Sequence, residues 1–188
     1  VTIHQFWDSG NIPSTLTAWQ QTWKNIGLNY KLWSYSDCEY LLSKHLPNSK
    51  FKYDIQKWDI LRLLICYEYG GIYADVDCEF VGSSDDLVFD SDTFISERVS
   101  STAKLIHPYF FFARKDSTFL RYIIKNISRL LDETYSTDRF LKEKGRVVKD
   151  STGPCGMTRL YATFDCKQSI RLIDRPIYLS HHNTKSWL

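Results

Sequence analysis

The stretch Tyr69-Gly70-Gly71-Ile72-Tyr73-Ala74-Asp75-Val76-Asp77 decides the fold of this chain. A glycine pair ends the helical pattern of residues 54–69, and a strand is expected at residues 72–77. Because successive side chains of a strand alternate between faces, Asp75 and Asp77 should face the same side, about 7 Å apart. Like charges at that separation repel by roughly 2 kcal/mol at an effective dielectric of about 20. A shared divalent cation would remove this repulsion, so the stretch predicts a metal site at the edge of a sheet.

Strands and helices alternate along the rest of the chain. Strands are expected at residues 3–7, 28–33, 72–77, 93–96, 109–113, 170–173 and 177–179. Helices are expected at residues 14–27, 54–69, 117–131 and 154–164, with a further short helix opened by a capping box at Ser36–Glu39. This order predicts an α/β fold with a mixed, mostly parallel sheet flanked by helices, built as one domain over residues 1–188.

Composition narrows the class of protein. The formal net charge of +2 gives no electrostatic case for nucleic acid, and five cysteines without C-x-x-C spacing indicate neither a disulfide framework nor a thiolate zinc site. The 15% aromatic content predicts that some rings line a ligand cleft. No apolar run reaches the ~20 residues that cross a bilayer, and the residues from Val1 onward show neither the basic region nor the apolar region expected of a signal peptide. We therefore expect a soluble cytoplasmic protein, or one bound peripherally to the inner face of a membrane.

Charged residues within the apolar helix of residues 54–69 point to a site. Asp59 and Arg62 lie three apart and share one helix face, where they either pair with each other or open into a polar pocket beside Asp75 and Asp77. The two later aspartates offer hard oxygen ligands for Mg²⁺ or Mn²⁺, ions that keep positions free for substrate phosphates. A basic segment at Arg139–Lys149 is expected to be a solvated helix and loop, with contact to anionic lipid or a charged acceptor as the alternative.

Five motifs occur in order along the chain and carry a resemblance to a known family. They are Ile3–Trp7, Trp58–Arg62, Tyr69–Asp77, Thr152–Pro154 and a late His-Ser-Trp segment. The chain resembles the DXD-motif glycosyltransferases of the family (GT32-like) that contains yeast initiating alpha-mannosyltransferases and bacterial capsular polysaccharide glycosyltransferases, with clostridial glucosylating toxins as more distant relatives. The resemblance implies a GT-A fold and retaining, Mn²⁺- or Mg²⁺-dependent hexosyl transfer from a UDP- or GDP-sugar. The implied acceptor is a glycan or lipid-linked glycan, in polysaccharide or glycoconjugate synthesis.

The resemblance also implies roles for residues in the first half of the chain. Trp7 matches the position that stacks on the donor base, although a tryptophan of the core would also fit there. Asp59 and Arg62 match the pair that contacts the donor sugar hydroxyls. Asp75 corresponds to the carboxylate that reaches sugar, ribose and metal. Tyr73 corresponds to an aromatic ring beside the nucleotide.

The remaining roles implied by the resemblance concern the metal and the C-terminal segment. Asp77 corresponds to the main metal ligand, and either His181 or His182 completes the metal site, unless both belong to a solvated tail. Ser186 and Trp187 match a segment that covers the diphosphate.

The chain departs from the family pattern at Trp58, where a small residue is usual, and at Cys78-Glu79, where apolar residues are usual. Donor preference therefore stays open. Thr152–Pro154 is expected to start a helix near the cleft, where the helix start would bind an anion or an acceptor hydroxyl. The alternative is that these residues form a plain turn.

No side chain stands out as a nucleophile, so catalysis is expected to consist of positioning and of electrostatic stabilisation of the departing diphosphate. Two other functions remain as alternatives. One is a non-catalytic protein that binds nucleotide sugars or carbohydrate. The other is a phosphotransferase in which Asp75 attacks and Asp77 acts as acid.

Overall fold

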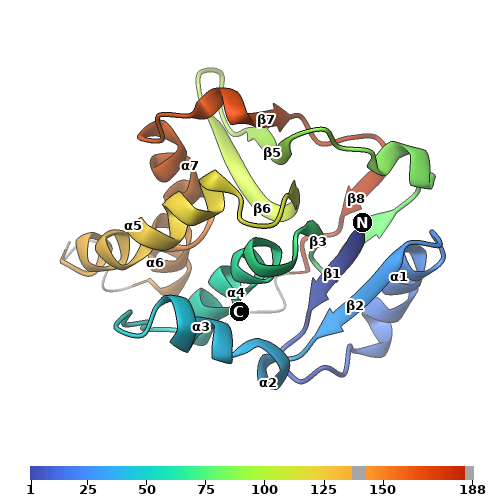
Figure 1. The fold of residues 1–188 in the computed structure, drawn as a ribbon, viewed down its shortest axis with the longest axis horizontal. Helices are drawn as coiled ribbons and strands as arrows, with labels where there is room; N and C mark the ends of the chain where they lie inside the picture. Colours follow the sequence, from blue (N-terminus) through green and yellow to red (C-terminus); the bar gives the residue numbers. More distant parts are fainter. Residues whose placement is uncertain (137–142, 185–188) are drawn as a thin grey trace.

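The computed structural model describes residues 1–136 and 143–184. Its centre is a six-stranded sheet in the order β2-β1-β3-β6-β5-β7 (Figure 1). The strands are β1 (Thr2–Phe6), β2 (Asn29–Trp33), β3 (Gly71–Ala74), β5 (Asp92–Arg98), β6 (Lys104–Ala113) and β7 (Ile170–Ile173). β1 runs parallel to β2 and β3, and β5 runs parallel to β7, whereas β6 is antiparallel to both its neighbours. The predicted mixed, mostly parallel sheet is confirmed.

Helices cover the sheet, and a small second sheet lies beside it (Figure 1). The α-helices are α1 (Ser14–Lys24), α2 (Tyr35–Cys38), α3 (Tyr40–His45), α4 (Asp54–Tyr69), α5 (Thr118–Tyr135), α6 (Lys144–Ser151) and α7 (Pro154–Ala162). The small sheet pairs β4 (Cys78–Phe80) with β8 (Leu179–His181), and the 3₁₀ turns are η1 (Ser84–Leu87) and η3 (Lys167–Ser169). α4 contacts β1, β3 and β6, α7 contacts β6, and α1 contacts β4. α4, the helix that ends just before the glycine pair, therefore packs directly on the central strands.

Alternation along the central strands divides the apolar residues between two cores. Tyr73 of β3 stacks on Phe111 of β6, with ring centroids 5.6 Å apart, in the core that α4 and α5 cover. Its neighbours Ile72 and Ala74 belong to the other core, together with Trp23 of α1. The period of two that the sequence predicts for this strand therefore holds from Ile72 to Ala74.

The glycine pair between α4 and β3 has a steric reason. Gly70 and Gly71 have φ of 66° and 120°, which side-chain-bearing residues rarely adopt. A Cβ on Gly71 would lie 2.4 Å from the carbonyl oxygen of Thr2 in β1. The glycines therefore allow the chain to reverse from helix to strand while β3 lies directly against β1.

The strand that leads to the two aspartates is shorter than predicted. β3 ends at Ala74, and the segment Asp75–Cys78 forms a turn in which the Cys78 N–H donates to the Asp75 carbonyl at 3.0 Å. The chain turns here because β4 pairs with β8 in the small sheet and not with a strand of the large one. The prediction that Asp75 and Asp77 share one strand face is therefore wrong.

Other differences are local. The capping box of α2 joins Ser34 to Asp37 and not Ser36 to Glu39, and α1 begins at Ser14 with Pro13 as its N-cap. β5 and β6 form longer strands than expected because residues 93–98 and 104–112 pair as an antiparallel hairpin.

An irregularity in β6 shapes the site. Pairing with β5 passes from Phe94 and Phe111 to Ile95 and His107, so the residues between them on β6 lack partners on β5. Pro108 lies in this interval, and because it has no N–H it cannot donate to the ladder. Such irregularities redirect side chains at the edges of active sites. Here the irregularity leaves the Pro108 carbonyl free to accept a hydrogen bond from α4.

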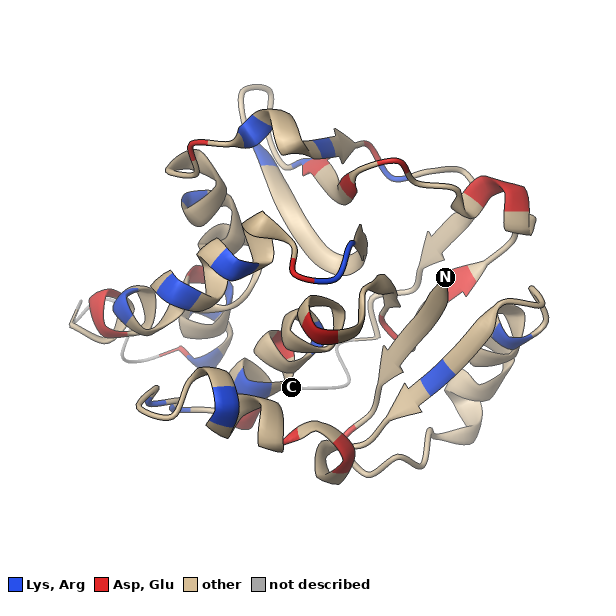
Figure 2. Ribbon diagram, in the orientation of Figure 1, with Lys and Arg blue, Asp and Glu red and all other residues tan. Residues whose placement is uncertain are grey.

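Charge is distributed as the near-balanced composition predicts. Figure 2 shows basic and acidic segments along α5, while the middle of β6 carries neither. Among the described residues, no helix has the length and apolar character that crossing a bilayer requires.

Candidate active site

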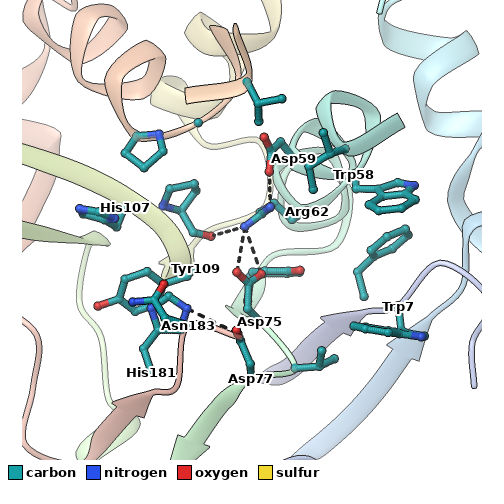
Figure 3. A pocket seen from close by; sticks show the side chains of 18 of the residues that line it. Trp7, Trp58, Asp59, Arg62, Asp75, Asp77, His107, Tyr109, His181 and Asn183 are labelled. Atoms are coloured by element: carbon teal, nitrogen blue, oxygen red, sulfur yellow. Dashed lines mark hydrogen bonds and ion pairs between the residues drawn. The ribbon is translucent and has the colours of Figure 1, made fainter. Parts of the chain in front are cut away.

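A cavity of about 640 Å³ lies where β1 and β3 end, and Figure 3 shows it from close by. Open α/β sheets bind ligands beyond the carboxyl ends of their strands, and volumes of this order suit small-molecule ligands. Its walls come from the segment after β1, from α4, from the turn after β3, from β6, from the α6–α7 junction and from the segment after β8. Segments distant in sequence thus converge on one space.

Arg62 is the centre of a buried ion network. Its Nη2 donates to Asp59 Oδ1, and its Nη1 donates to both carboxylate oxygens of Asp75 at 3.0 and 3.2 Å and to the Pro108 carbonyl at 3.4 Å. Asp59 Oδ2 accepts from the Thr152 hydroxyl at 2.6 Å. The two possibilities left open by the sequence therefore occur together, since Asp59 and Arg62 pair with each other and also line the cavity.

Burial and the neighbouring opposite charges shift the pKa values of Asp59, Arg62 and Asp75 in opposite directions. Burial raises the pKa of Asp75 to about 6, although Arg62 lowers it and Asp77 raises it further. Burial also raises the pKa of Asp59, with Arg62 and Thr152 as partial compensation. Burial disfavours the charge of Arg62, but Asp75 and Asp59 outweigh it and raise its pKa. The guanidinium stays charged and holds two carboxylates that would otherwise bind protons more readily.

Asp77 is held by the last residue of β8 and by the segment that follows it. His181 Nε2 lies 3.4 Å from Asp77 Oδ1, and Asp77 Oδ2 accepts from the Thr184 N–H at 3.0 Å and from its hydroxyl at 3.1 Å. Burial alone would raise the pKa of Asp77, but His181 and Thr184 outweigh it, and the pKa is lowered. The imidazole of His181 stacks on Tyr109 with ring centroids 4.0 Å apart. Asp77 is therefore an ionised carboxylate beside an oriented imidazole.

Potential metal ligands gather at this point. Within the described part of the chain, ligand atoms of Asp77, Cys78 and His181 all lie within 4.8 Å of one another. Cys78 is fully buried, and burial raises its pKa far above the usual value. Asp75 is not part of this group, because its carboxylate is turned to Arg62. Of these three residues, Asp77 and His181 line the cavity, whereas Cys78 is not among its lining residues.

The two adjacent histidines point to different surroundings. His181 lines the cavity, whereas His182 stacks on Trp19 at 3.9 Å and pairs with Glu79 at 3.0 Å. Glu79 lies on β4, which pairs with β8. The structure thus distinguishes His181 from His182 by position, a distinction that their sequence does not make.

The remaining predicted donor residues divide into two groups. Trp7 and Tyr73 both line the cavity, with Trp7 half-buried and Tyr73 2% exposed. The guanidinium carbon of Arg62 lies 5.6 Å from the centroid of the Tyr73 ring. Ser186 and Trp187 lie outside the described residues, as does part of the basic segment at 139–149.

Several cavity residues were not predicted as site residues from the sequence. They are Asp8, Trp58, His107, Pro108, Tyr109, Lys149 and Asn183. Trp58 stood out as a departure from a family pattern, and Thr152 was noted only as a helix start. Lys149 was noted only as part of the basic segment, and the rest carry no local signal, because β6, the segment after β1 and the segment after β8 meet here only in the fold.

Comparison with solved structures defines the class of fold. The glycosyltransferase domain of the YGT toxin superposes with a TM-score of 0.63 at 9% identity, covering 100% of this chain and 82% of that domain. The PaToxG glycosyltransferase superposes with a TM-score of 0.54 at 17% identity, covering 85% of this chain and 67% of the other. At these identities the likeness is one of fold alone, and it is the GT-A fold that the resemblance implied.

Sequence comparison places the chain more closely. Residues 6–100 match the family described as "Glycosyltransferase sugar-binding region containing DXD motif", and the chain belongs to this family. It is 29% identical over 82 residues to inositol phosphoceramide mannosyltransferase 3 and 31% identical over 88 residues to inositol phosphoceramide mannosyltransferase 1, both from Schizosaccharomyces pombe. Each match covers 40% of this chain but only 23% and 27% of those relatives. The predicted relation to this family is confirmed.

Proposed function

We propose that the protein is a metal-dependent, retaining glycosyltransferase that moves a hexose from a UDP- or GDP-sugar to a glycan or lipid-linked glycan. The observation that carries the proposal is the network in which Arg62 joins Asp59 to Asp75 inside a cavity that Trp7 and Asp77 also line. We further propose that residues 1–188 act as one catalytic domain, since strands from both ends of the chain, from β1 and β2 to β7, share the six-stranded sheet.

The cavity has the groups that a nucleotide sugar requires. Trp7 offers an aromatic face to a base, and the carboxylates of Asp59 and Asp75 accept hydrogen bonds from sugar hydroxyls. Asp75 keeps 25% of its side chain exposed, so it remains accessible while it is bound to Arg62. This order along the cavity supports a donor whose base lies at Trp7 and whose sugar lies near Arg62.

The residues beside Asp77 fit a divalent metal. Asp77 presents an ionised carboxylate and His181 an oriented imidazole, and Mn²⁺ and Mg²⁺ accept oxygen ligands while keeping positions for substrate phosphates. When bound, such an ion neutralises the charge that develops on a departing diphosphate. Asp77 and His181 are proposed to hold it, with Asp75 close by on the same turn.

Retention is proposed from the way the carboxylates are occupied. Asp59 uses one oxygen for Arg62 and the other for Thr152, and both oxygens of Asp75 accept from Arg62. Neither is a free nucleophile, so the chain's own contribution is to position the donor and to stabilise charge. The acceptor hydroxyl then attacks from the face that the diphosphate leaves, with a donor phosphate oxygen taking its proton.

The names of the yeast relatives guide the choice of substrates to test. They are mannosyltransferases of inositol phosphoceramide by name, and this chain spans about a quarter of their length. A mannosyl donor therefore belongs in the first panel, together with glucosyl and galactosyl donors of both UDP and GDP. Exposed Lys149, which lines the cavity, would suit an acceptor that carries an anionic group.

Hydrolysis of each donor, followed by nucleotide release with and without Mn²⁺, tests the proposal. We expect Mn²⁺-dependent release from one class of donor. Binding without release across the whole panel would favour a non-catalytic nucleotide-sugar-binding protein, and release of phosphate from generic phosphate esters would favour the aspartyl phosphotransferase.

A further inference from the structure

Trp58 occupies a distinctive place beside the acidic network. It directly precedes Asp59 on α4, and its position one turn before Arg62 turns the indole toward the cavity. The ring is half-buried and packs against Phe6, with ring centroids 6.4 Å apart. Figure 3 shows Trp58 and Trp7 at one end of the cavity, across from His107 and His181.

We propose that Trp58 is a second aromatic wall of the subsite for the donor base and sets the width of that subsite. The inference rests on the proposed function, in which the diphosphate lies at Asp77 and the base lies at Trp7. The base is then bounded by Trp7 and by Trp58, both half-buried residues of the cavity wall. An indole at this place adds contact area to any base, because every base has a π-face.

A second cavity indicates what Trp58 separates. This space of about 290 Å³ shares Ile55 and Trp58 with the main cavity, and the rest of its lining comes from Lys52, Tyr53, Asp54 and Lys144. The indole is therefore a partition between an aromatic end and a charged recess. A smaller residue at position 58 would join the two spaces and leave the base open on that side.

The tryptophans differ in how their indole N–H groups are satisfied. The buried indoles of Trp23 and Trp33 donate to the Cys78 carbonyl and to His4 Nδ1. Buried indoles are normally satisfied in this way. Trp58 donates to no partner among residues 1–136 and 143–184, so its N–H remains available to a ligand or to water.

The test compares two substitutions of similar bulk. Trp58→Leu removes the ring but keeps the apolar contact with Phe6, whereas Trp58→Phe keeps an aromatic face. Calorimetry with Mn²⁺ measures the affinity of each variant for UDP, for GDP and for pyrophosphate, which has no base. We expect Trp58→Leu to bind the preferred nucleotide about tenfold more weakly, because stacking of a base on an aromatic residue contributes on this order. Its affinity for pyrophosphate should be unchanged, and Trp58→Phe should stay close to the wild type.

The outcomes separate this inference from the proposed function. Equal nucleotide affinity in Trp58→Leu and the wild type would overturn the role of Trp58 alone. A parallel loss of pyrophosphate affinity would also overturn it, because the substitution would then act on the whole site. Absence of Mn²⁺-dependent nucleotide binding by the wild type would overturn the proposed function together with this inference.

Discussion

Replacing Arg62 by methionine should destabilise the fold, and by more at high pH than at low pH. The substitution keeps the apolar stem but removes the guanidinium that joins Asp59 to Asp75. Breaking a buried ion network on one side typically costs about 3–5 kcal/mol, because the remaining charge is left uncompensated. We expect a loss of this size at pH 8, measured by urea unfolding followed through tryptophan fluorescence.

The pH dependence follows from the direction of the pKa shifts. The pKa of Asp75 is about 6 and that of Asp59 is raised, both above the unfolded value near 3.9. Stability therefore falls as pH rises through this window, because the folded state binds protons more tightly. Without Arg62 both pKa values rise further, so the difference between variant and wild type should be smaller at pH 5 than at pH 8.

A matched control is Arg129→Met, which removes an exposed arginine paired with Glu133 on α5. Exposed pairs of this kind contribute about 0.3–0.5 kcal/mol, so this variant should unfold almost like the wild type at both pH values. An Arg62→Met loss below about 1 kcal/mol, or one that is equal at pH 5 and pH 8, would refute the account of the buried network.

Two further predictions concern packing around the site. Gly71→Ala should lower the free energy of unfolding by more than about 2 kcal/mol, because its Cβ would collide with the Thr2 carbonyl. Gly27→Ala, also at positive φ but with nothing within 4 Å of its Cβ, should cost only about 1 kcal/mol, and equal losses in the two variants would contradict the steric argument. Thr152→Val removes the donor to Asp59 Oδ2 and should cost about 1–3 kcal/mol in the same assay. A stability equal to the wild type would show that this hydrogen bond adds nothing to the network.

The sequence was sufficient for features that follow from local rules. The glycine pair marks the end of α4 at the predicted residue, because the backbone angles there require glycine. Asp59 and Arg62 could be placed on one helix face from their spacing. The mixed, mostly parallel sheet flanked by helices followed from the succession of strands and helices along the sequence.

The sequence was insufficient where distant segments decide the geometry. β3 ends at Ala74 and not at Asp77 as predicted, because β4 pairs with β8, a partner about a hundred residues away. The strand argument for Asp75 and Asp77 therefore fails, and Arg62 and His181 take up the two carboxylates separately. No local pattern distinguishes His181 from His182, since their surroundings come from Tyr109 and from Trp19.

The measurement that tests the central claim most directly is calorimetric binding of UDP and GDP, each titrated with and without Mn²⁺, to the wild type and to Asp77→Ala. Asp85→Ala, which removes an exposed acid of η1, is the matched control. The account predicts Mn²⁺-dependent binding of one nucleotide by the wild type and the control, and its loss in Asp77→Ala while that variant remains folded. Equally tight Mn²⁺-dependent binding by Asp77→Ala would contradict the claim that Asp77 anchors the cation and the diphosphate.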